Sequence, residues 1–226
     1  MQDPLFDDPR EQVAAACRRL AAAGLVDRTG GNVSVRVGEH VAITPTGAEL
    51  AQVTAADVPI VDLGGRVVDG ALAPTSEIDL HLAVLAHHDA GAVVHSHAPF
   101  ATAVACVVDE LPAIHYEMVM LGGPVRVAPY ETFGTPALAA AAVEALEGRS
   151  VALLANHGTI AFGPDVDAAV RATELLEWAA TLYWRASQIG TPHVLDEEDL
   201  RAVIDAAVER KYGTTKPAEE HTSAQR

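Results

Sequence analysis

The chain has 226 residues, half of them hydrophobic but only 4% aromatic, which is enough for one sizeable globular domain with a core of alanine, valine and leucine. Its 31 acidic and 15 basic residues give a formal net charge of −16, which argues against nucleic acid or anionic membranes as partners, since both favour clustered lysine and arginine. Without an apolar run of signal-peptide or membrane-spanning length, we expect a cytoplasmic protein in which Cys17 and Cys106 are buried and reduced.

The first half of the chain is predicted to form two helices, two strand pairs and one further strand. In chain order these elements are a helix over 9–23, strand pairs over 32–37 with 41–44 and over 59–63 with 66–68, a helix over 76–88 and a strand over 92–95. The two strand pairs should join in one sheet. Thr75 or Ser76 is expected to be the N-cap of the second helix.

The second half alternates strands and helices. It is predicted to contain a segment over 102–108 whose pattern fits helix or strand and whose opening turn at Ala98-Pro99 favours a helix. The other elements are a strand over 125–128, a helix over 136–146 opened by Thr135, strands over 151–155 and 159–162, and helices over 165–187 and 196–210. No repeat or linker interrupts these elements. We therefore predict a single mixed α/β domain over residues 1–210 and a polar tail over residues 211–226.

Histidines follow two apolar strands in a pattern typical of a metal site. His95 and His97 come directly after Ala92-Val93-Val94, and side chains two apart on a strand leave the same face. His157 follows a second apolar strand and precedes Gly158, whose missing side chain is expected to let a substrate approach. Three neutral imidazoles with an open fourth position describe a catalytic zinc site. For His-x-His alone, the commoner alternative is a buried imidazole bonded to a backbone carbonyl.

A carboxylate is also needed to move protons, and Glu77 lies upstream at the predicted start of a helix. With it, the pattern favours a metal-dependent enzyme. Six other histidines, including His81, are interpreted as solvated or structural, and His115 is assigned to packing.

Three short polar clusters can form an anion site. They are Gly30-Gly31-Asn32, Thr44-Pro45-Thr46-Gly47 and Thr75-Ser76, all at turns or a helix start where free N–H groups and hydroxyls converge. The alternative interpretation is that each only forms a turn or an N-cap. Their joint presence beside Glu77 favours a phosphate cradle.

These segments together resemble the class II aldolase/adducin family, most closely its L-fuculose-1-phosphate aldolase branch. The resemblance covers residues 10–190 and rests on Gly30–Arg36, Ile43–Gly47, Thr75–Glu77, Val94–Ala98, His115–Tyr116, Ala128–Thr135 and Asn156–Gly158. It implies a three-layer α/β/α sandwich around a mixed, largely antiparallel sheet. It also implies a cyclic homotetramer with active sites at the subunit interfaces.

The resemblance further implies roles for individual residues. One Zn²⁺ per subunit, or Mn²⁺ or Co²⁺ in its place, would bind His95, His97 and His157. Glu77 would be the acid/base residue, and the substrate phosphate would be held by Asn32, Thr46, Gly47, Thr75 and Ser76. Tyr116 would bind the aldehyde oxygen in a neighbouring subunit's site, Phe133 would line the aldehyde pocket, and Tyr212 would fold from the tail over an adjacent site.

The expected reaction is cleavage of a phosphorylated ketose of the L-fuculose-1-phosphate type to dihydroxyacetone phosphate and an aldehyde, through an enediolate. The same scaffold also serves a sugar-acid phosphate decarboxylase, a methylthioribulose-phosphate dehydratase and a pentulose-phosphate epimerase. Glu77 disfavours the epimerase, whose pattern has aspartate at this position. A structural head domain like that of adducin is the non-enzymatic alternative, and it has no need of three metal-binding histidines.

Overall fold

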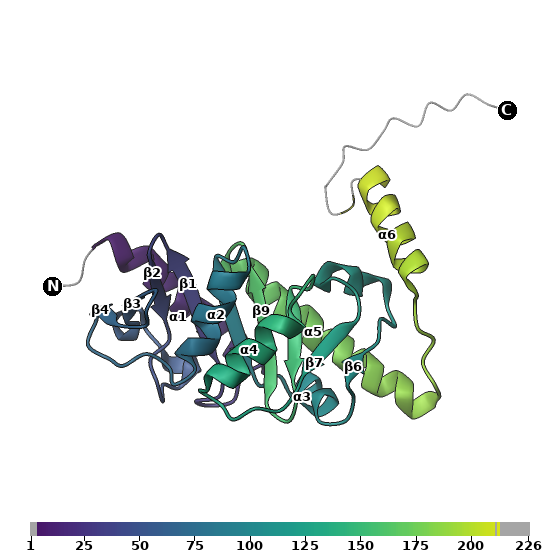
Figure 1. Cartoon of the computed structure of the whole chain (residues 1–226), viewed down its shortest axis with the longest axis horizontal. Coiled ribbons are helices and arrows are strands. Elements are labelled where there is room, and N and C mark those ends of the chain that lie inside the picture. The colour runs from purple at the N-terminus through teal and green to yellow at the C-terminus, as the bar shows by residue number, and fades with distance from the viewer. Residues whose placement is uncertain (1–3, 211, 213–226) are drawn as a thin grey trace.

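The fold is built on a nine-stranded sheet, seen in a computed structural model that describes residues 4–210 and 212 (Figure 1). The strands are β1 (Asn32–Val37), β2 (His40–Ile43), β3 (Ile60–Asp62), β4 (Val67–Asp69), β5 (Ala92–Ser96), β6 (Glu110–Leu111), β7 (Val125–Ala128), β8 (Val151–Leu154) and β9 (Gly158–Gly163). Their order across the sheet is β4-β3-β2-β1-β5-β9-β8-β7-β6. Only β7 and β8 pair in parallel; all other neighbours are antiparallel.

Helices cover both faces of this sheet. They are α1 (Asp7–Ala22), α2 (Ile78–His87), α3 (Pro99–Ala105), α4 (Pro136–Ala145), α5 (Val166–Ile189) and α6 (Glu197–Arg210), with short 3₁₀ turns at Pro4–Phe6, Leu50–Gln52, Ala55–Asp57 and Tyr116–Leu121. The helices α2 and α4 lie side by side on one face, and α1, α3 and α5 cover the other. The helix α6 projects from the end of the molecule that holds β6 and β7 (Figure 1).

The strand pleat divides the apolar side chains between two cores. On β5, Ala92 and Val94 pack toward α1 and α5, whereas Val93 packs toward α2 and α4. By the same alternation, Val33 and Val35 of β1 face the α1 layer, which leaves Asn32 and Ser34 on the α2 side. The predicted three-layer α/β/α sandwich around a mixed, largely antiparallel sheet is therefore confirmed.

Most predicted elements are present, with shifted ends. The N-cap of α2 is Glu77 instead of Thr75 or Ser76. The Thr75 hydroxyl accepts a bond from the Glu77 N–H at 3.3 Å but does not cap the helix. The helix predicted over 102–108 begins earlier, at the proline that opens α3. The two-residue strand β6 was not predicted because it is too short to show alternation.

Of the two cysteines that were expected to be buried, only Cys17 is. Cys17 is buried in α1, and burial raises the pKa of its thiol to about 12. Cys106 is exposed, because it follows the last residue of α3 and lies beyond the buried face of that helix. Within the described part of the chain, no helix has the length and apolar character needed to cross a bilayer. Apart from Tyr212, the tail predicted over residues 211–226 lies outside the described residues.

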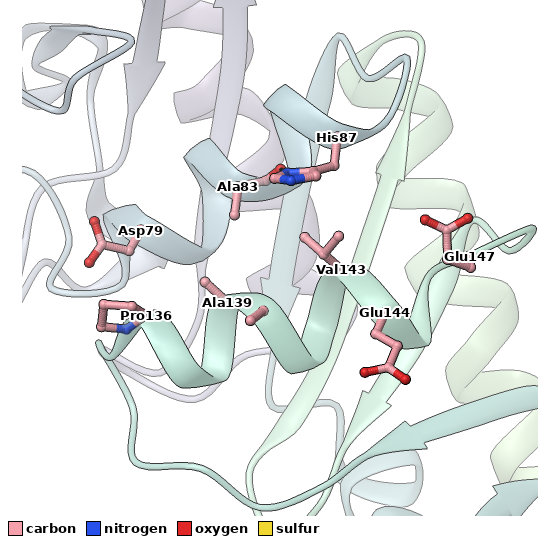
Figure 2. A pocket seen from close by; sticks show the side chains of 9 residues that line it. Asp79, Ala83, His87, Pro136, Ala139, Val143, Glu144 and Glu147 are labelled. Atoms are coloured by element: carbon pink, nitrogen blue, oxygen red, sulfur yellow. Dashed lines mark hydrogen bonds between the residues drawn. The ribbon is translucent and has the colours of Figure 1, made fainter.

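An open groove of about 680 Å³ runs between α2 and α4 (Figure 2). Its titratable side chains do not converge: Asp79 lies at the start of α2, and Glu144 and Glu147 lie toward the far end of α4 (Figure 2). The His87 Nδ1–H donates to the Ala83 carbonyl at 2.8 Å. Nothing in this groove resembles the histidine cluster described next.

Candidate metal centre and active site

Three histidines meet at one end of the central strands. The strands β5 and β9 pair in antiparallel register, with His95 opposite Ile160 and Ser96 opposite Thr159. The end of β5 therefore lies beside the start of β9, where His157 follows Asn156. Asn156 has a φ of 54°, a left-handed conformation that asparagine tolerates and that turns the chain from β8 into β9.

The three imidazoles form a compact triad. Their ring centroids are 4.8–5.2 Å apart, and their candidate ligand nitrogens all lie within 4.8 Å of one another. His97 lies just beyond the strand, so its ring is tilted 78° from that of His95 and is not parallel to it. In the described part of the chain this is the one group of three or more such side chains that could hold a metal ion.

The hydrogen bonds of His95 point a lone pair into the triad. Its Nδ1–H donates to the Thr159 carbonyl at 2.8 Å, so Nε2 carries no proton and lies 3.1 Å from Nε2 of His97. Burial is the main cause that lowers the pKa of His95 to about 4, and burial also lowers that of His97. Both rings are therefore neutral near pH 7, as metal ligands must be.

Glu77 adds a carboxylate to the triad. One oxygen, Oε2, accepts from the Asn32 side-chain N–H at 2.8 Å and lies 3.3 Å from His95 Nε2. The other, Oε1, lies 3.4 Å from His157 Nε2 and has no hydrogen bond within the described structure. Burial acts to raise the pKa of Glu77, but His95, the Asn32 hydrogen bond and His157 together hold it below its usual range.

This donor set fits a divalent cation. Facing lone pairs 3.1 Å apart repel unless a proton or a cation lies between them, and the buried Oε1 of Glu77 lacks a partner beside them. Three imidazole nitrogens and a nearby carboxylate are the ligands that zinc and similar metals prefer.

Two glycines allow the triad to pack this closely. A Cβ at Gly158 would collide with the Ser96 carbonyl oxygen and lie 2.9 Å from Cδ2 of His97. A Cβ at Gly30 would lie 2.8 Å from Nδ1 of His97. The interpretation of Gly158 as an opening for substrate is therefore wrong: its missing side chain makes room for the neighbouring strand and the His97 ring.

The predicted phosphate residues lie at the start of β1 and in two adjoining loops. Asn32 and Thr75 are buried and bonded to each other at 3.1 Å, while Ser76 is exposed and lines the same cavity as Glu77. Thr46 and Gly47 are exposed in the turn after β2. That turn is tied to the Thr75 loop by the bonds from Thr46 N to Ala73 O at 3.0 Å and from Thr75 N to Thr44 O at 2.9 Å.

The predicted aromatic residues divide between two hollows. Phe133 lines the histidine cavity of about 340 Å³, together with Tyr130 and Glu131. Tyr116 and Tyr212 line a different hollow of about 330 Å³, formed by the Tyr116–Leu121 turn and α6. The pKa of Tyr116 is raised to about 12, mainly by a hydrogen bond with the Tyr212 side chain and by the charge of the Tyr212 hydroxyl. Within one chain, Tyr116 is therefore not among the residues that line the histidine cavity.

Sequence reasoning missed two residues of this region. His81 is fully buried and bonded to Asn32 and Ser34, although it was assigned no chemistry. The available signal was its spacing, because a residue four after Glu77 on a helix shares its face. Glu131 lines the cavity from a loop, where no periodicity marks it.

Comparisons with known proteins agree with this geometry. Residues 11–184 match the family described as Class II Aldolase and Adducin N-terminal domain. The chain is 40% identical to a 5-deoxy-D-ribulose 1-phosphate aldolase of Bacillus thuringiensis serovar kurstaki, over 87% of this chain and 93% of that protein. It is also 40% identical to a 5-methylthioribulose-1-phosphate/5-deoxyribulose-1-phosphate aldolase of Rhodospirillum rubrum, over 87% of this chain and 89% of that protein.

A solved structure of an L-fuculose 1-phosphate aldolase superposes with a TM-score of 0.86 at 34% identity, covering 90% of this chain and 99% of that one. The chain therefore belongs to the class II aldolase and adducin family. It is an enzyme of the aldolase type, a carbon–carbon lyase.

Replacing Gly158 by alanine should lower the free energy of unfolding by about 1–3 kcal/mol and reduce bound metal, because the new Cβ overpacks the Ser96 carbonyl and the His97 ring. Chemical denaturation and elemental analysis of the purified protein measure both effects. Gly190→Ala is the matched control, since nothing lies within 4 Å of a Cβ there. Unchanged stability and metal content in Gly158→Ala would contradict this account of the triad.

Proposed function

We propose that the protein is a metal-dependent class II aldolase that cleaves a 1-phosphorylated ketose to dihydroxyacetone phosphate and a short aldehyde. The observation that carries the proposal is the Glu77 carboxylate, placed 3.3 and 3.4 Å from the Nε2 atoms of His95 and His157. A proton carrier and a cation site are thus adjacent, as is required for chemistry next to a ketone.

The cleavage breaks the bond between carbons 3 and 4 of the ketose. Its electrons move toward the ketone at carbon 2, so negative charge develops on that oxygen, while the proton of the 4-hydroxyl passes to the ionised Glu77 carboxylate. Bound to His95, His97 and His157, a divalent cation would supply Lewis-acid stabilisation of this charge, worth several kcal/mol. Glu77 then delivers a proton to carbon 3 and removes it again in the direction of condensation. Its Oε1, free of hydrogen bonds within the described structure, is the atom available for that transfer.

We assign the cation as one Zn²⁺ per subunit, with Mn²⁺ or Co²⁺ able to replace it. Three imidazole ligands and an open position are typical of catalytic zinc. Imidazole also binds other first-row divalent metals, so the metal that the cell supplies depends on availability as well as on ligand type.

The phosphate is assigned to the start of β1 and the two loops bonded to it and to each other, which together hold Asn32, Thr46, Gly47, Thr75 and Ser76. The hydroxyls of Thr46, Thr75 and Ser76 supply donors without a formal positive charge. The Thr75 hydroxyl already accepts bonds from Asn32 and from the Glu77 N–H, so its own proton is free to donate.

The cavity favours a neutral aldehyde over a carboxylate-bearing fragment. Two carboxylates line it, those of Glu77 and Glu131, and none of the described residues that line it is lysine or arginine. A sugar-acid phosphate would bring a further negative charge into this space, and like charges at close range disfavour binding. This observation disfavours the decarboxylase alternative.

Among ketoses, we propose 5-deoxyribulose 1-phosphate first, with 5-methylthioribulose 1-phosphate and L-fuculose 1-phosphate as the next candidates. The two relatives named for the first two substrates are 40% identical to this chain, against 34% for the L-fuculose 1-phosphate aldolase structure. The aromatic rings of Phe133 and Tyr130 at the cavity suit an aldehyde with little polar surface.

We infer that the enzyme acts as a homotetramer in which Tyr116 completes a neighbouring subunit's site. Tyr116 is 42% exposed and lines a hollow distinct from the histidine cavity, so it is available to a second copy of the chain. Its raised pKa keeps the phenol protonated, as a donor to the aldehyde oxygen requires. Tyr212, which is 69% exposed beside it, is proposed to cover the same neighbouring site.

A panel of phosphorylated ketoses, assayed with and without a chelator, tests the proposal. Release of dihydroxyacetone phosphate is coupled to its reduction and followed by loss of NADH absorbance. We expect cleavage of at least one 1-phosphorylated ketose, lost with the chelator and restored by Zn²⁺. Evolution of carbon dioxide from a sugar-acid phosphate, without ketose cleavage, would favour the decarboxylase instead.

Glu77→Gln should keep bound metal and lose turnover by about 10²–10⁴-fold, because an amide cannot accept the proton. His95→Ala is the contrasting variant, since removing one of three protein ligands should lower both metal content and rate. Elemental analysis beside steady-state kinetics separates the two effects. Full turnover in Glu77→Gln, or a full complement of zinc in His95→Ala, would remove that residue from its proposed role.

Mixed assemblies test the shared site directly. Glu77→Gln and Tyr116→Phe should each be nearly inactive alone, yet co-expression should restore up to about one quarter of wild-type turnover, because random mixing joins intact Glu77 and Tyr116 in one site of four. Separately tagged chains allow the mixed species to be purified. Mixed oligomers without restored activity would place both residues in the same chain's site.

A further inference from the structure

A buried hydrogen-bond chain runs behind Glu77. Asn32 and Ser34 of β1 point from the same face of the strand toward α2, where His81 lies one turn after Glu77. His81 is 0% exposed, and both ring nitrogens are bonded: Nε2 to Oδ1 of Asn32, and Nδ1 to the Ser34 hydroxyl at 2.7 Å. None of the roles proposed above uses His81 or Ser34.

The direction of every bond in this chain follows from the carboxylate at its end. An ionised Glu77 can only accept, so the Asn32 amide nitrogen faces it at 2.8 Å and also donates to Thr75 Oγ1 at 3.1 Å. The carbonyl oxygen of Asn32 then faces His81, which must donate from Nε2–H. A neutral ring has only one N–H, so Nδ1 accepts from the Ser34 hydroxyl.

The surroundings of His81 agree with a neutral ring. Complete burial, and after it the nearby His95, lower its pKa to about 3, although Glu77 acts in the opposite direction. Of these two groups, Glu77 is the N-cap of α2 and His95 lies on β5.

We propose that His81 and Ser34 are positioning residues that hold the Asn32 amide with its N–H groups on Glu77 and Thr75. The inference rests on the proposed function of Glu77 as the proton carrier. An amide that rotated by 180° would place its oxygen against the carboxylate, and the His81 N–H prevents that rotation. Glu77 is consequently fixed through Oε2, while Oε1 stays free to reach the substrate.

Two substitutions of His81 test this positioning role. His81→Leu removes the donor and leaves the Asn32 oxygen buried without a partner, whereas His81→Gln can donate to Asn32 and accept from Ser34. We expect His81→Leu to lower kcat by about 10–100-fold at unchanged metal content, and His81→Gln to recover it to within about fivefold of wild type. His87→Leu is the matched control on the same helix, since His87 faces the groove between α2 and α4 (Figure 2) and should not change kcat.

A double-mutant comparison separates positioning from a general effect on folding. If His81 acts through Asn32, then adding His81→Leu to Asn32→Ala should not lower kcat further. The inference would be overturned if the loss of kcat in the double variant equalled the product of the two single-variant losses. Full activity of His81→Leu would also overturn it. Failure of His81→Gln to recover any activity would also overturn it.

Histidine-ring ¹H–¹⁵N spectra of the Zn²⁺-loaded protein give a readout that does not depend on turnover. We expect His81 to carry its proton on Nε2 with a bare Nδ1, and Ser34→Ala to weaken this preference. A proton on Nδ1 would overturn the inference. Absence of ketose cleavage in the wild type would overturn the proposed function instead, and the spectra would still report the hydrogen-bond chain.

Discussion

The site depends on the register of β5 between its two neighbours. β5 places His95 opposite Asn32 on one side and Ser96 opposite Thr159 on the other, so a single strand joins the histidine triad to the residues that hold Glu77. Because side chains alternate along a strand, a slip of one residue would move His95 from the α2 face to the opposite face. The apolar run Ala92-Val93-Val94 fixes the register by filling both cores.

Burial then sets the chemistry of the side chains that this register brings together. It keeps the His95 ring neutral, because the charged form would lose its hydration. It also leaves the ionised Glu77 dependent on a few donors, of which Asn32 is one. In such surroundings a misplaced hydrogen-bond partner costs more than in water, so the orientation of one amide matters.

The sequence was sufficient to locate the three histidines, but not the surrounding residues that hold the site in place. The triad was identifiable because each histidine follows an apolar strand. His81 was interpreted as solvated or structural, because a lone histidine on a helix carries no sign of what covers it. Gly158 was assigned to substrate access, although its Cβ position is filled by the Ser96 carbonyl. Such close approaches of backbone to side chain involve residues that are distant in sequence, so local patterns do not reveal them.

The sequence by itself determined the alternation of strands and helices, the three histidines and Glu77, since these follow from apolar periodicity and from residue chemistry. Only the tertiary structure decided which polar groups share a cavity: it united Phe133 with the triad and placed Tyr116 beside Tyr212 in another hollow. The physical reason is that strand order and register arise from packing across the whole sheet. Those long-range pairings fix distances between side chains that no local stretch of sequence encodes.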